Sequence, residues 1–400
     1  MVIKKQSVFA MIIVLFPLCY LFRNIEVLSY YDELVGMIAT AYVIMLLLKG
    51  QLIKNDLYIC ICLTIITIIG AISNIVSGIT SNIFAIVVDA MWLWKTFACY
   101  IAFKYIGSRP RYREEIVRNL VFLAKFSIII IFATSIIGEV INIGVTSDYT
   151  LYGIRQFVFW GNSLQAGWLL FCALLILASY NIGSSRFRRY YIMAIIPAIL
   201  TFSSLIYCFF FVATVLLLIL RESTVFKKKY IVLLAVGIAL FTFADIQNYF
   251  MSDSVRMKLI QGGIITANKY FPLGSGFATY GSEMASRYYS QVYVDLGWEN
   301  MWGLGRTYNQ YLNDNFFAGI LGEFGYIGFL VYLFALYFLF KEANSILLNR
   351  RERCIAVAIV LTIAVVMIGS ASAKSVMGVC TFSVLGIICS KNIYLYDQKG

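Results

Sequence analysis

The sequence predicts an all-α polytopic membrane protein with about twelve transmembrane helices and one large extracytoplasmic loop. Hydrophobic residues make up 61% of the 400 positions and charged residues only 13%. A soluble globular protein needs a larger charged surface than this. The chain also contains long apolar runs, which predict membrane-crossing helices, and one long polar stretch, residues 246–316, which predicts the large loop.

The expected spans follow from the apolar runs and the charged breaks between them. A membrane-crossing helix needs about 20 mostly apolar residues. Twelve candidates result: 8–22, 34–48, 57–73, 83–103, 120–140, 156–180, 190–202, 204–220, 230–245, 317–340, 354–372 and 376–390. Residues 190–220 form either two short helices that turn at residues 201–204 or one long tilted helix. The chain is thus expected to divide into 1–245 with about nine spans, the loop 246–316, and 317–400 with about three spans.

Basic residues gather in alternate loops, which predicts the orientation. The cytoplasmic side holds loops rich in Lys and Arg. With the N-terminus inside, the cytoplasmic segments contain residues 49–54, 104–118, 186–189, 221–229 and 341–353. Both termini are then cytoplasmic and the loop 246–316 lies on the opposite side. The formal net charge of +12 reflects this topology, so we expect no nucleic-acid partner.

The polar residue types exclude several kinds of site. The chain has no histidine, which excludes a histidine acid or base and a histidine-containing zinc site. All nine cysteines lie in expected spans, where they are interpreted as small apolar packing residues. The loop 246–316 offers no convincing set of metal ligands, and we expect neither a metal ion nor a cofactor.

Aromatic residues are dense in the loop 246–316. Flat rings stack on the apolar faces of sugars, and they also anchor at a bilayer interface, so both roles stay open for any single ring. The density favours a glycan-binding groove, for which the candidates are Tyr280, Tyr288, Tyr289, Trp298 and Trp302.

Arginines of the same loop are candidates for binding an anionic lipid headgroup. A guanidinium group binds phosphate oxygens bidentately and keeps its charge at low dielectric. Arg256, Arg287 and Arg306 either bind a diphosphate or form salt bridges within the loop. The turn from Pro272 to Gly276 either brings backbone N–H groups to a phosphate or is an ordinary turn.

Three segments of the chain occur in a characteristic order. Arg256 precedes an expected helix and the sequence Pro-Leu-Gly-Ser-Gly at 272–276, and Asn-Asp-Asn at 313–315 precedes a glycine-marked stretch at 321–328. Arg155 precedes Trp-Gly-Asn-Ser at 160–163 and Thr-Phe-Ser-Ser at 201–204. Together they resemble the family of bacterial O-antigen ligases and O-antigen or capsule repeat-unit polymerases. The third segment departs from the family pattern at a proline and at a second arginine.

The resemblance implies a Wzy-like polymerase of the bacterial cytoplasmic membrane, without a metal requirement. Its substrates would be polyprenyl-diphosphate-linked oligosaccharides within membrane lipid, and a chain-length regulator protein is a partner that the sequence leaves open. It implies diphosphate-binding roles for Arg155, Arg256, and Arg287 or Arg306. Asp314 or Glu323 would act on the acceptor hydroxyl.

Family members that act as ligases carry a histidine near position 314, so its absence favours a polymerase over an O-antigen ligase. A lipid-linked oligosaccharide flippase or other transporter is the alternative from another class.

Charged and glycine residues near the spans lead to further expectations. Asp314 either acts as a base or caps the helix that follows it. Lys95, inside a span, either pairs with a carboxylate of a neighbouring helix or faces a lipid-phosphate cavity. Lys374 is expected at a short outer turn, where it would assist the diphosphate. Gly322, Gly325 and Gly328 recur every third residue and are expected to allow close helix packing.

Overall fold

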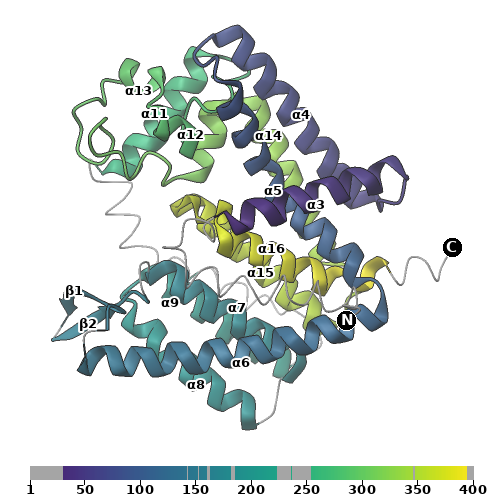
Figure 1. Cartoon of the computed structure of the whole chain (residues 1–400). Helices are drawn as coiled ribbons and strands as arrows, with labels where there is room; N and C mark the ends of the chain where they lie inside the picture. The colour runs from purple at the N-terminus through teal and green to yellow at the C-terminus, as the bar shows by residue number, and fades with distance from the viewer. Residues whose placement is uncertain are drawn as a thin grey trace, which may run out of the picture.

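The computed structural model describes residues 30–141, 143–151, 153–159, 163–181, 185–222, 254–345 and 347–393, together with the isolated position 236. The expected spans 8–22 and 230–245 lie outside these residues. In the described part the chain is predominantly helical, and its elements are coloured along the chain in Figure 1.

Seven described helices are long and apolar enough to cross a membrane. They are α3 (Tyr31–Leu48), α4 (Lys54–Ser77), α5 (Ile83–Gly107), α6 (Pro110–Val140), α14 (Phe316–Ala343), α15 (Arg350–Gly369) and α16 (Val376–Cys389). Each overlaps one expected span. The prediction of a helical chain with many potential membrane spans is confirmed, whereas the count of twelve stays a prediction.

The middle of the chain adds three further helices and a departure from the all-α prediction. The helices are α7 (Ser163–Asn181), α8 (Ser185–Leu200) and α9 (Ser204–Glu222). Between residues 190 and 220 the chain has two helices, because it turns at Phe202 with φ 48°. Strands β1 (Thr146–Leu151) and β2 (Ile154–Phe157) form an antiparallel hairpin. Threonine, isoleucine and phenylalanine favour strands, and Gly153 turns the hairpin with φ 80°, so the expected span at 156 begins later.

The segment 254–315 is folded. It contains α11 (Val255–Lys269), α12 (Glu283–Arg287) and α13 (Gln291–Asp295). Ser254 caps the N-terminus of α11, and its hydroxyl accepts the Met257 N–H. This helix lies close to the start of α14, since a Cβ atom added to Gly263 would meet the Ala318 carbonyl at 2.9 Å. A separate small hydrophobic cluster fills the interior of the segment.

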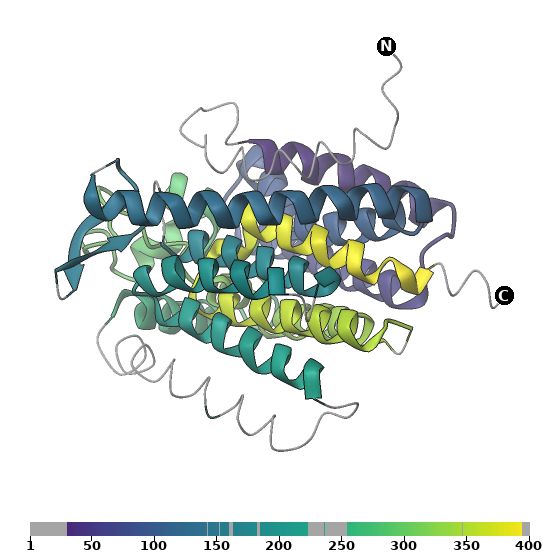
Figure 2. The ribbon, with the colours of Figure 1, turned by 90° about the horizontal axis from the view of Figure 1, so that it is seen from below.

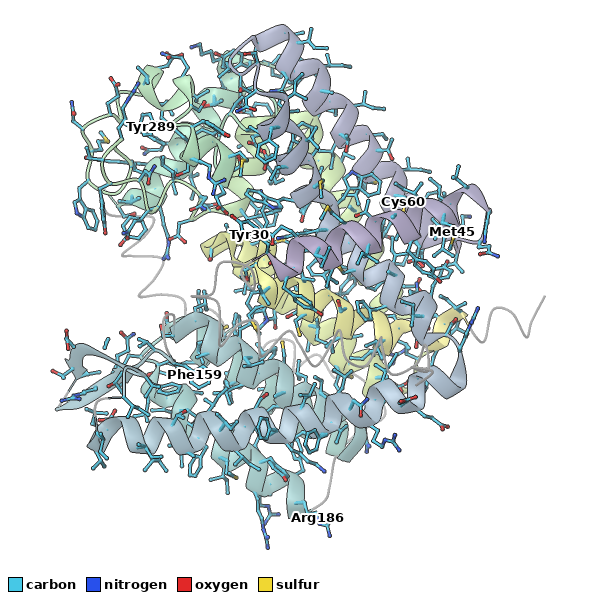
Figure 3. All side chains as sticks on the ribbon, viewed as in Figure 1. Tyr30, Met45, Cys60, Phe159, Arg186 and Tyr289 are labelled. Atoms are coloured by element: carbon cyan, nitrogen blue, oxygen red, sulfur yellow. The ribbon has the colours of Figure 1, made fainter. Side chains whose placement is uncertain are left out.

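The helices run side by side between two ends of the molecule. The hairpin and the segment 254–315 lie at one end, and the C-terminal end of α16 lies at the other (Figures 1 and 2). Helix α5 packs against both α3 and α16, and α4 packs against α14. Side chains fill the space between them, with Tyr289 at the first end and Met45 at the second (Figure 3).

Candidate functional site

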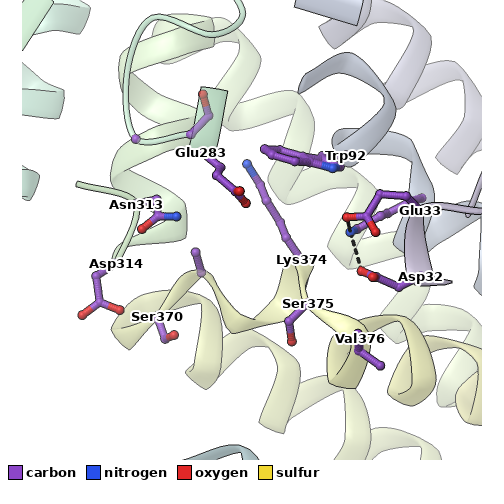
Figure 4. A pocket seen from close by; sticks show the side chains of 14 residues that line it. Asp32, Glu33, Trp92, Glu283, Asn313, Asp314, Ser370, Lys374, Ser375 and Val376 are labelled. Atoms are coloured by element: carbon purple, nitrogen blue, oxygen red, sulfur yellow. Dashed lines mark hydrogen bonds and ion pairs between the residues drawn. The ribbon is translucent and has the colours of Figure 1, made fainter. Parts of the chain in front are cut away.

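A pocket of about 350 Å³ opens where several helices end beside the segment 254–315. Its walls come from the first turn of α3, from α5, from residues 281–283 and 313–314, and from the 3₁₀ helix η1 (Ala371–Lys374) with the start of α16. In Figure 4 the Lys374 side chain lies between Glu283 and Trp92, the carboxylates of Asp32 and Glu33 lie near each other, and the Asp314 carboxylate is turned away from Lys374 at the edge of the pocket. The charged side chains on the walls are Asp32, Glu33, Lys95, Glu283, Asp314 and Lys374.

The structure joins two predicted site residues that are far apart in the sequence. Arg256 donates from Nε and Nη2 to Asp314 Oδ2, over 3.2 and 3.0 Å. Asp314 also lines the pocket. Burial raises the pKa of the Asp314 carboxyl above its ordinary value, and the Arg256 guanidinium opposes that rise. The arrangement provides a carboxylate that is held in position and is a stronger base than an exposed aspartate.

Asp314 does not cap α14, contrary to one of the two expectations for it. The capping residue is Asn315, whose Oδ1 accepts the Ala318 N–H over 2.9 Å. The other end of the same amide donates to the Ile368 carbonyl at 3.1 Å. Asn315 therefore fixes the start of α14 against the end of α15, which leaves the Asp314 side chain available to the pocket.

Lys374 ends the 3₁₀ helix η1 between α15 and α16 and extends into the pocket toward Trp92 and Glu283 (Figure 4). Its ammonium group lies 5.1 Å from the centre of the Phe316 ring. Among the described residues it has no ion-pair partner within 4.0 Å. It is therefore the cation of the pocket that is best placed to meet an anionic ligand.

Lys95 forms an ion pair with carboxylates of the neighbouring helix α3. This was one of the two expectations for Lys95. Its Nζ lies 2.7 Å from Asp32 Oδ2 and 3.2 Å from Glu33 Oε1, both on α3. Lys95 and Asp32 are almost completely buried, so each compensates the charge of the other. Because all three residues line the pocket, this buried cluster forms part of its wall.

The turn at 272–276 does not offer its amides to a phosphate. Every backbone N–H from Gly274 to Gly281 donates to an acceptor inside the protein. The acceptors are the carbonyls of Tyr270, Gly322 and Glu323, and the side chains of Asn74, Asp89, Glu323 and Tyr293. Two of these side chains are carboxylates, which occupy the position that an anionic ligand would need. The expectation of a phosphate-binding turn is therefore wrong.

Glu323 lies behind this turn and does not line the pocket. Its side chain is 2% exposed, and its Oε1 accepts from the N–H groups of Thr279 and Tyr280 at 3.3 and 3.4 Å. Asp89 of α5 holds the neighbouring Ala278 N–H at 2.8 Å. The geometry supports a positioning role for both residues, because residues 281 and 282, which follow the turn, form part of the pocket wall.

The glycines of α14 act differently from the expected packing stripe. Gly325 interrupts the helix with φ 62°, and a Cβ atom there would meet the Pro272 carbonyl at 2.3 Å. Gly322 instead faces the Tyr280 ring. The kink leaves the carbonyls of residues 322 and 323 available, and the N–H groups of Ser275 and Gly276 donate to them. The glycines thus allow the backbone of the turn to pack closely against α14.

None of the four predicted diphosphate-binding arginines lines the pocket: Arg256 contacts it only through Asp314, and the other three lie elsewhere. Arg155 is on β2, where its backbone N–H donates to Glu139. Arg287 ends α12 and is exposed. Arg306 pairs with Glu299 at 3.1 Å, and its guanidinium lies 5.2 Å from the centre of the Tyr289 ring. For Arg306 the structure therefore agrees with the second expectation, a salt bridge within the loop.

The predicted glycan-binding aromatics separate into two groups. Tyr280 and Trp298 are 0% and 5% exposed and pack with Tyr293 inside the segment 254–315. They fill its core and present no face to a ligand in this conformation. Tyr288 and Trp302 are 53% and 69% exposed. Tyr289 is half-buried, and its hydroxyl donates to the Leu304 carbonyl. A stacking role for these three rings stays a prediction.

Sequence reasoning missed Asp32, Glu33 and Trp92, which form the α3 and α5 side of the pocket. A signal was present, since Lys95 inside a span required a carboxylate from a neighbouring helix. The site was instead expected in the loop 246–316.

The described residues contain no group of three or more His, Cys, Asp or Glu side chains that could hold a metal ion. In comparisons of the sequence with family models and with curated proteins, nothing matches.

Proposed function

We propose that this protein joins polyprenyl-diphosphate-linked oligosaccharide repeat units into a surface polysaccharide, either O-antigen or capsule, at the outer face of the bacterial cytoplasmic membrane. The observation that carries the proposal is the Arg256–Asp314 ion pair at a pocket that also contains Lys374. A carboxylate base beside a cation is the minimum that glycosyl transfer from a diphosphate requires.

The distribution of charge supports the outer location. The pocket lies at the N-terminal ends of α3, α14 and α16. Basic residues that are expected on the cytoplasmic side lie near the other end of the bundle: Lys49 just after α3, Lys54 at the start of α4, Arg109 between α5 and α6, Lys341 in the last turn of α14 and Arg351 at the start of α15. By the rule that basic loops stay inside, the pocket opens outside.

The chemistry follows from the positions of the charged groups. The terminal hydroxyl of the acceptor gives its proton to the Asp314 carboxylate, and its oxygen forms a bond to the anomeric carbon of the donor sugar. The bond from that carbon to the diphosphate oxygen breaks, and the electron pair leaves with the diphosphate. Lys374 stabilises the charge on the leaving group, and Arg256 holds Asp314 in place. Polyprenyl diphosphate is a good leaving group, so positioning and charge stabilisation suffice.

The direct test is reconstitution. Purified protein in lipid nanodiscs is given a defined polyprenyl-diphosphate-linked repeat unit, and the products are separated by length. A ladder of products is expected from the natural protein and none from Arg256→Ala. Lys269→Ala is the matched control, because Lys269 lies on the same helix α11 in an exposed ion pair with Asp295 and outside the pocket walls. The absence of a ladder from the natural protein would contradict the proposal.

A deletion strain distinguishes the alternatives. If the protein is a polymerase, single repeat units are still exported and attached. Loss of all export would indicate a flippase, and intact polymer without attachment would indicate an O-antigen ligase.

A further inference from the structure

Two buried polar atoms on one wall of the pocket have no hydrogen-bond partner among the described residues. They are Trp92 Nε1 on α5 and Glu33 Oε2 on α3. Both side chains line the pocket, and Trp92 is only 8% exposed. Buried polar groups in proteins are nearly always paired, so unpaired ones require an explanation. One atom is a donor and the other an acceptor, so together they match a ligand that offers both.

The wall that carries these atoms is held rigidly. Lys95 Nζ holds the other carboxylate oxygen of Glu33 at 3.2 Å and Asp32 at 2.7 Å, and it lies 5.8 Å from the centre of the Trp92 ring. Helix α3 approaches α5 closely here, since a Cβ atom on Gly36 would meet Lys95 Cβ at 2.6 Å. Glu33 therefore keeps one oxygen bound and presents the other, which is a preorganised arrangement.

The charge of the wall restricts the ligand. Asp32 and Glu33 place two carboxyl groups against the single ammonium group of Lys95, so this wall has no unpaired cation that could bind a phosphate or a carboxylate. A neutral sugar satisfies both requirements, because a ring oxygen, hydroxyl or acetamido carbonyl accepts from Trp92 and a neighbouring hydroxyl donates to Glu33.

We propose that Trp92 and Glu33 form a subsite for an uncharged sugar of the acceptor glycan. The identity of the ligand as an acceptor rests on the function proposed above. The subsite selects neutral or N-acetylated sugars and disfavours uronic acids.

Direct binding tests the subsite. Methyl glycosides of glucose, N-acetylglucosamine and glucuronic acid are titrated against the protein in nanodiscs by saturation-transfer NMR. Saturable binding is expected for a neutral glycoside and weaker binding for the glucuronide. Trp92→Phe removes one hydrogen-bond donor and is expected to lower the affinity about fivefold. Trp94→Phe is the matched control, because its Nε1 on the same helix already donates to Thr67 and it does not line the pocket. Glu33→Gln, which leaves Asp32 on Lys95, is expected to reduce the discrimination against the glucuronide.

A second measurement separates this inference from the proposed function. In the ladder assay, Trp92→Phe is expected to raise the KM for the acceptor about fivefold with kcat unchanged. If the natural protein formed no ladder but bound a neutral glycoside through Trp92, the polymerase would be refuted and the sugar subsite would stand. Unchanged glycoside binding in Trp92→Phe, or tighter binding of the glucuronide by the natural protein, would overturn the subsite while ladder formation continued.

Discussion

Arg256 contacts a single carboxylate oxygen of Asp314 with two of its nitrogens, at 3.0 and 3.2 Å, across 58 residues of sequence. The contact joins the first turn of α11 to the residue just before the cap of α14. Both side chains are about one quarter exposed. The pair is neither a buried structural ion pair nor a free surface contact, and it stands at the edge of the pocket that Asp314 lines.

The first prediction concerns the roles of these two residues. Arg256→Ala is expected to abolish polymer in cells and ladders in vitro while the protein stays in the membrane. Asp314→Asn keeps the shape and the hydrogen-bond acceptor but is a much weaker base, so we expect a loss of at least 100-fold in rate. Western blotting of membranes and ladder assays measure both effects. Because Asn315 and not Asp314 caps α14, full activity of the Asn variant would remove Asp314 from the chemistry.

A second prediction follows from the ionisation of Asp314. Burial raises its pKa above the ordinary 3.8, and Arg256 opposes this rise. The ionised form is the base, so activity is lost as the pH falls through the pKa of Asp314, at a higher pH than for an ordinary aspartate. Arg256→Gln removes the opposing charge, so the acid limb of its residual activity is expected to move to higher pH. Lys269→Gln is the control, and an unchanged acid limb in Arg256→Gln would contradict the assignment.

The effect of the same pKa on stability has the opposite sense. A raised pKa means that folded Asp314 holds its proton more tightly than the unfolded chain does. Its contribution therefore favours folding below the unfolded pKa and is lost as the pH rises through the folded pKa. Stability and activity at this residue thus change in opposite directions with pH, which distinguishes loss of the base from acid unfolding.

The sequence alone predicts the long apolar helices and part of the candidate site. Continuous apolar runs gave the positions of α4, α5 and α14, because twenty apolar residues have few other folds available. Arg256 and Asp314 were predicted from the family resemblance together with their positions near the spans, and Lys374 from its expected place in a short turn. Trp92 and Glu33 were not, since an aromatic or acidic residue near the end of a span has several structural roles. Only the packing of α3 on α5 brings Glu33 beside Trp92, and only the contact of α5 with η1 brings them near Lys374.

The turn at 272–281 shows a limit of local interpretation. Proline and glycine indicated a turn, but its amides are satisfied by Asn74, Asp89 and Glu323. These side chains come from α4, α5 and α14, and no local pattern relates them to the turn. Irregular backbone between apolar helices is tolerated only where the protein supplies all of its hydrogen bonds.

A third prediction tests the anchoring role of Glu323. Glu323→Ala leaves the Thr279 and Tyr280 amides without their acceptor, and a buried unpaired group costs about 1–3 kcal/mol. We expect a lower unfolding temperature in detergent and reduced activity. Glu323→Gln retains an acceptor oxygen and is expected to keep most of the stability and activity. Complete loss of activity in a stably folded Gln variant would instead indicate chemistry at Glu323.

The kink in α14 leads to a fourth prediction. Gly325→Ala places a side chain at φ 62° and ψ −167°, a conformation essentially restricted to glycine, and brings its Cβ atom to 2.3 Å from the Pro272 carbonyl. Gly297→Ala also places a side chain at a positive φ, 72°, but nothing lies within 4 Å of its Cβ atom. We expect the control to lose about 1 kcal/mol from strain alone and the Gly325 variant to lose several times more. Thermal unfolding of the two variants in the same detergent measures the loss of stability in each. Equal losses would show that the contact between the turn and the kink of α14 does not constrain residue 325.

A fifth prediction concerns a buried charge cluster at the other end of α5. Lys104 Nζ lies 2.9 Å from Asp56 Oδ2 and 2.9 Å from Glu342 Oε1, and all three side chains are at most 3% exposed. Lys104→Met leaves two carboxylates facing each other in a dry interior, where a broken buried pair costs about 3–5 kcal/mol. We expect little protein in the membrane. Lys391→Met is the control, because Lys391 is about one third exposed beside Glu352 and such pairs contribute about 0–1 kcal/mol. Combining Lys104→Met with Asp56→Asn and Glu342→Gln removes the uncompensated charge and is expected to restore most of the protein level. If the triple variant were as poorly folded as Lys104→Met, the loss would come from packing and not from charge.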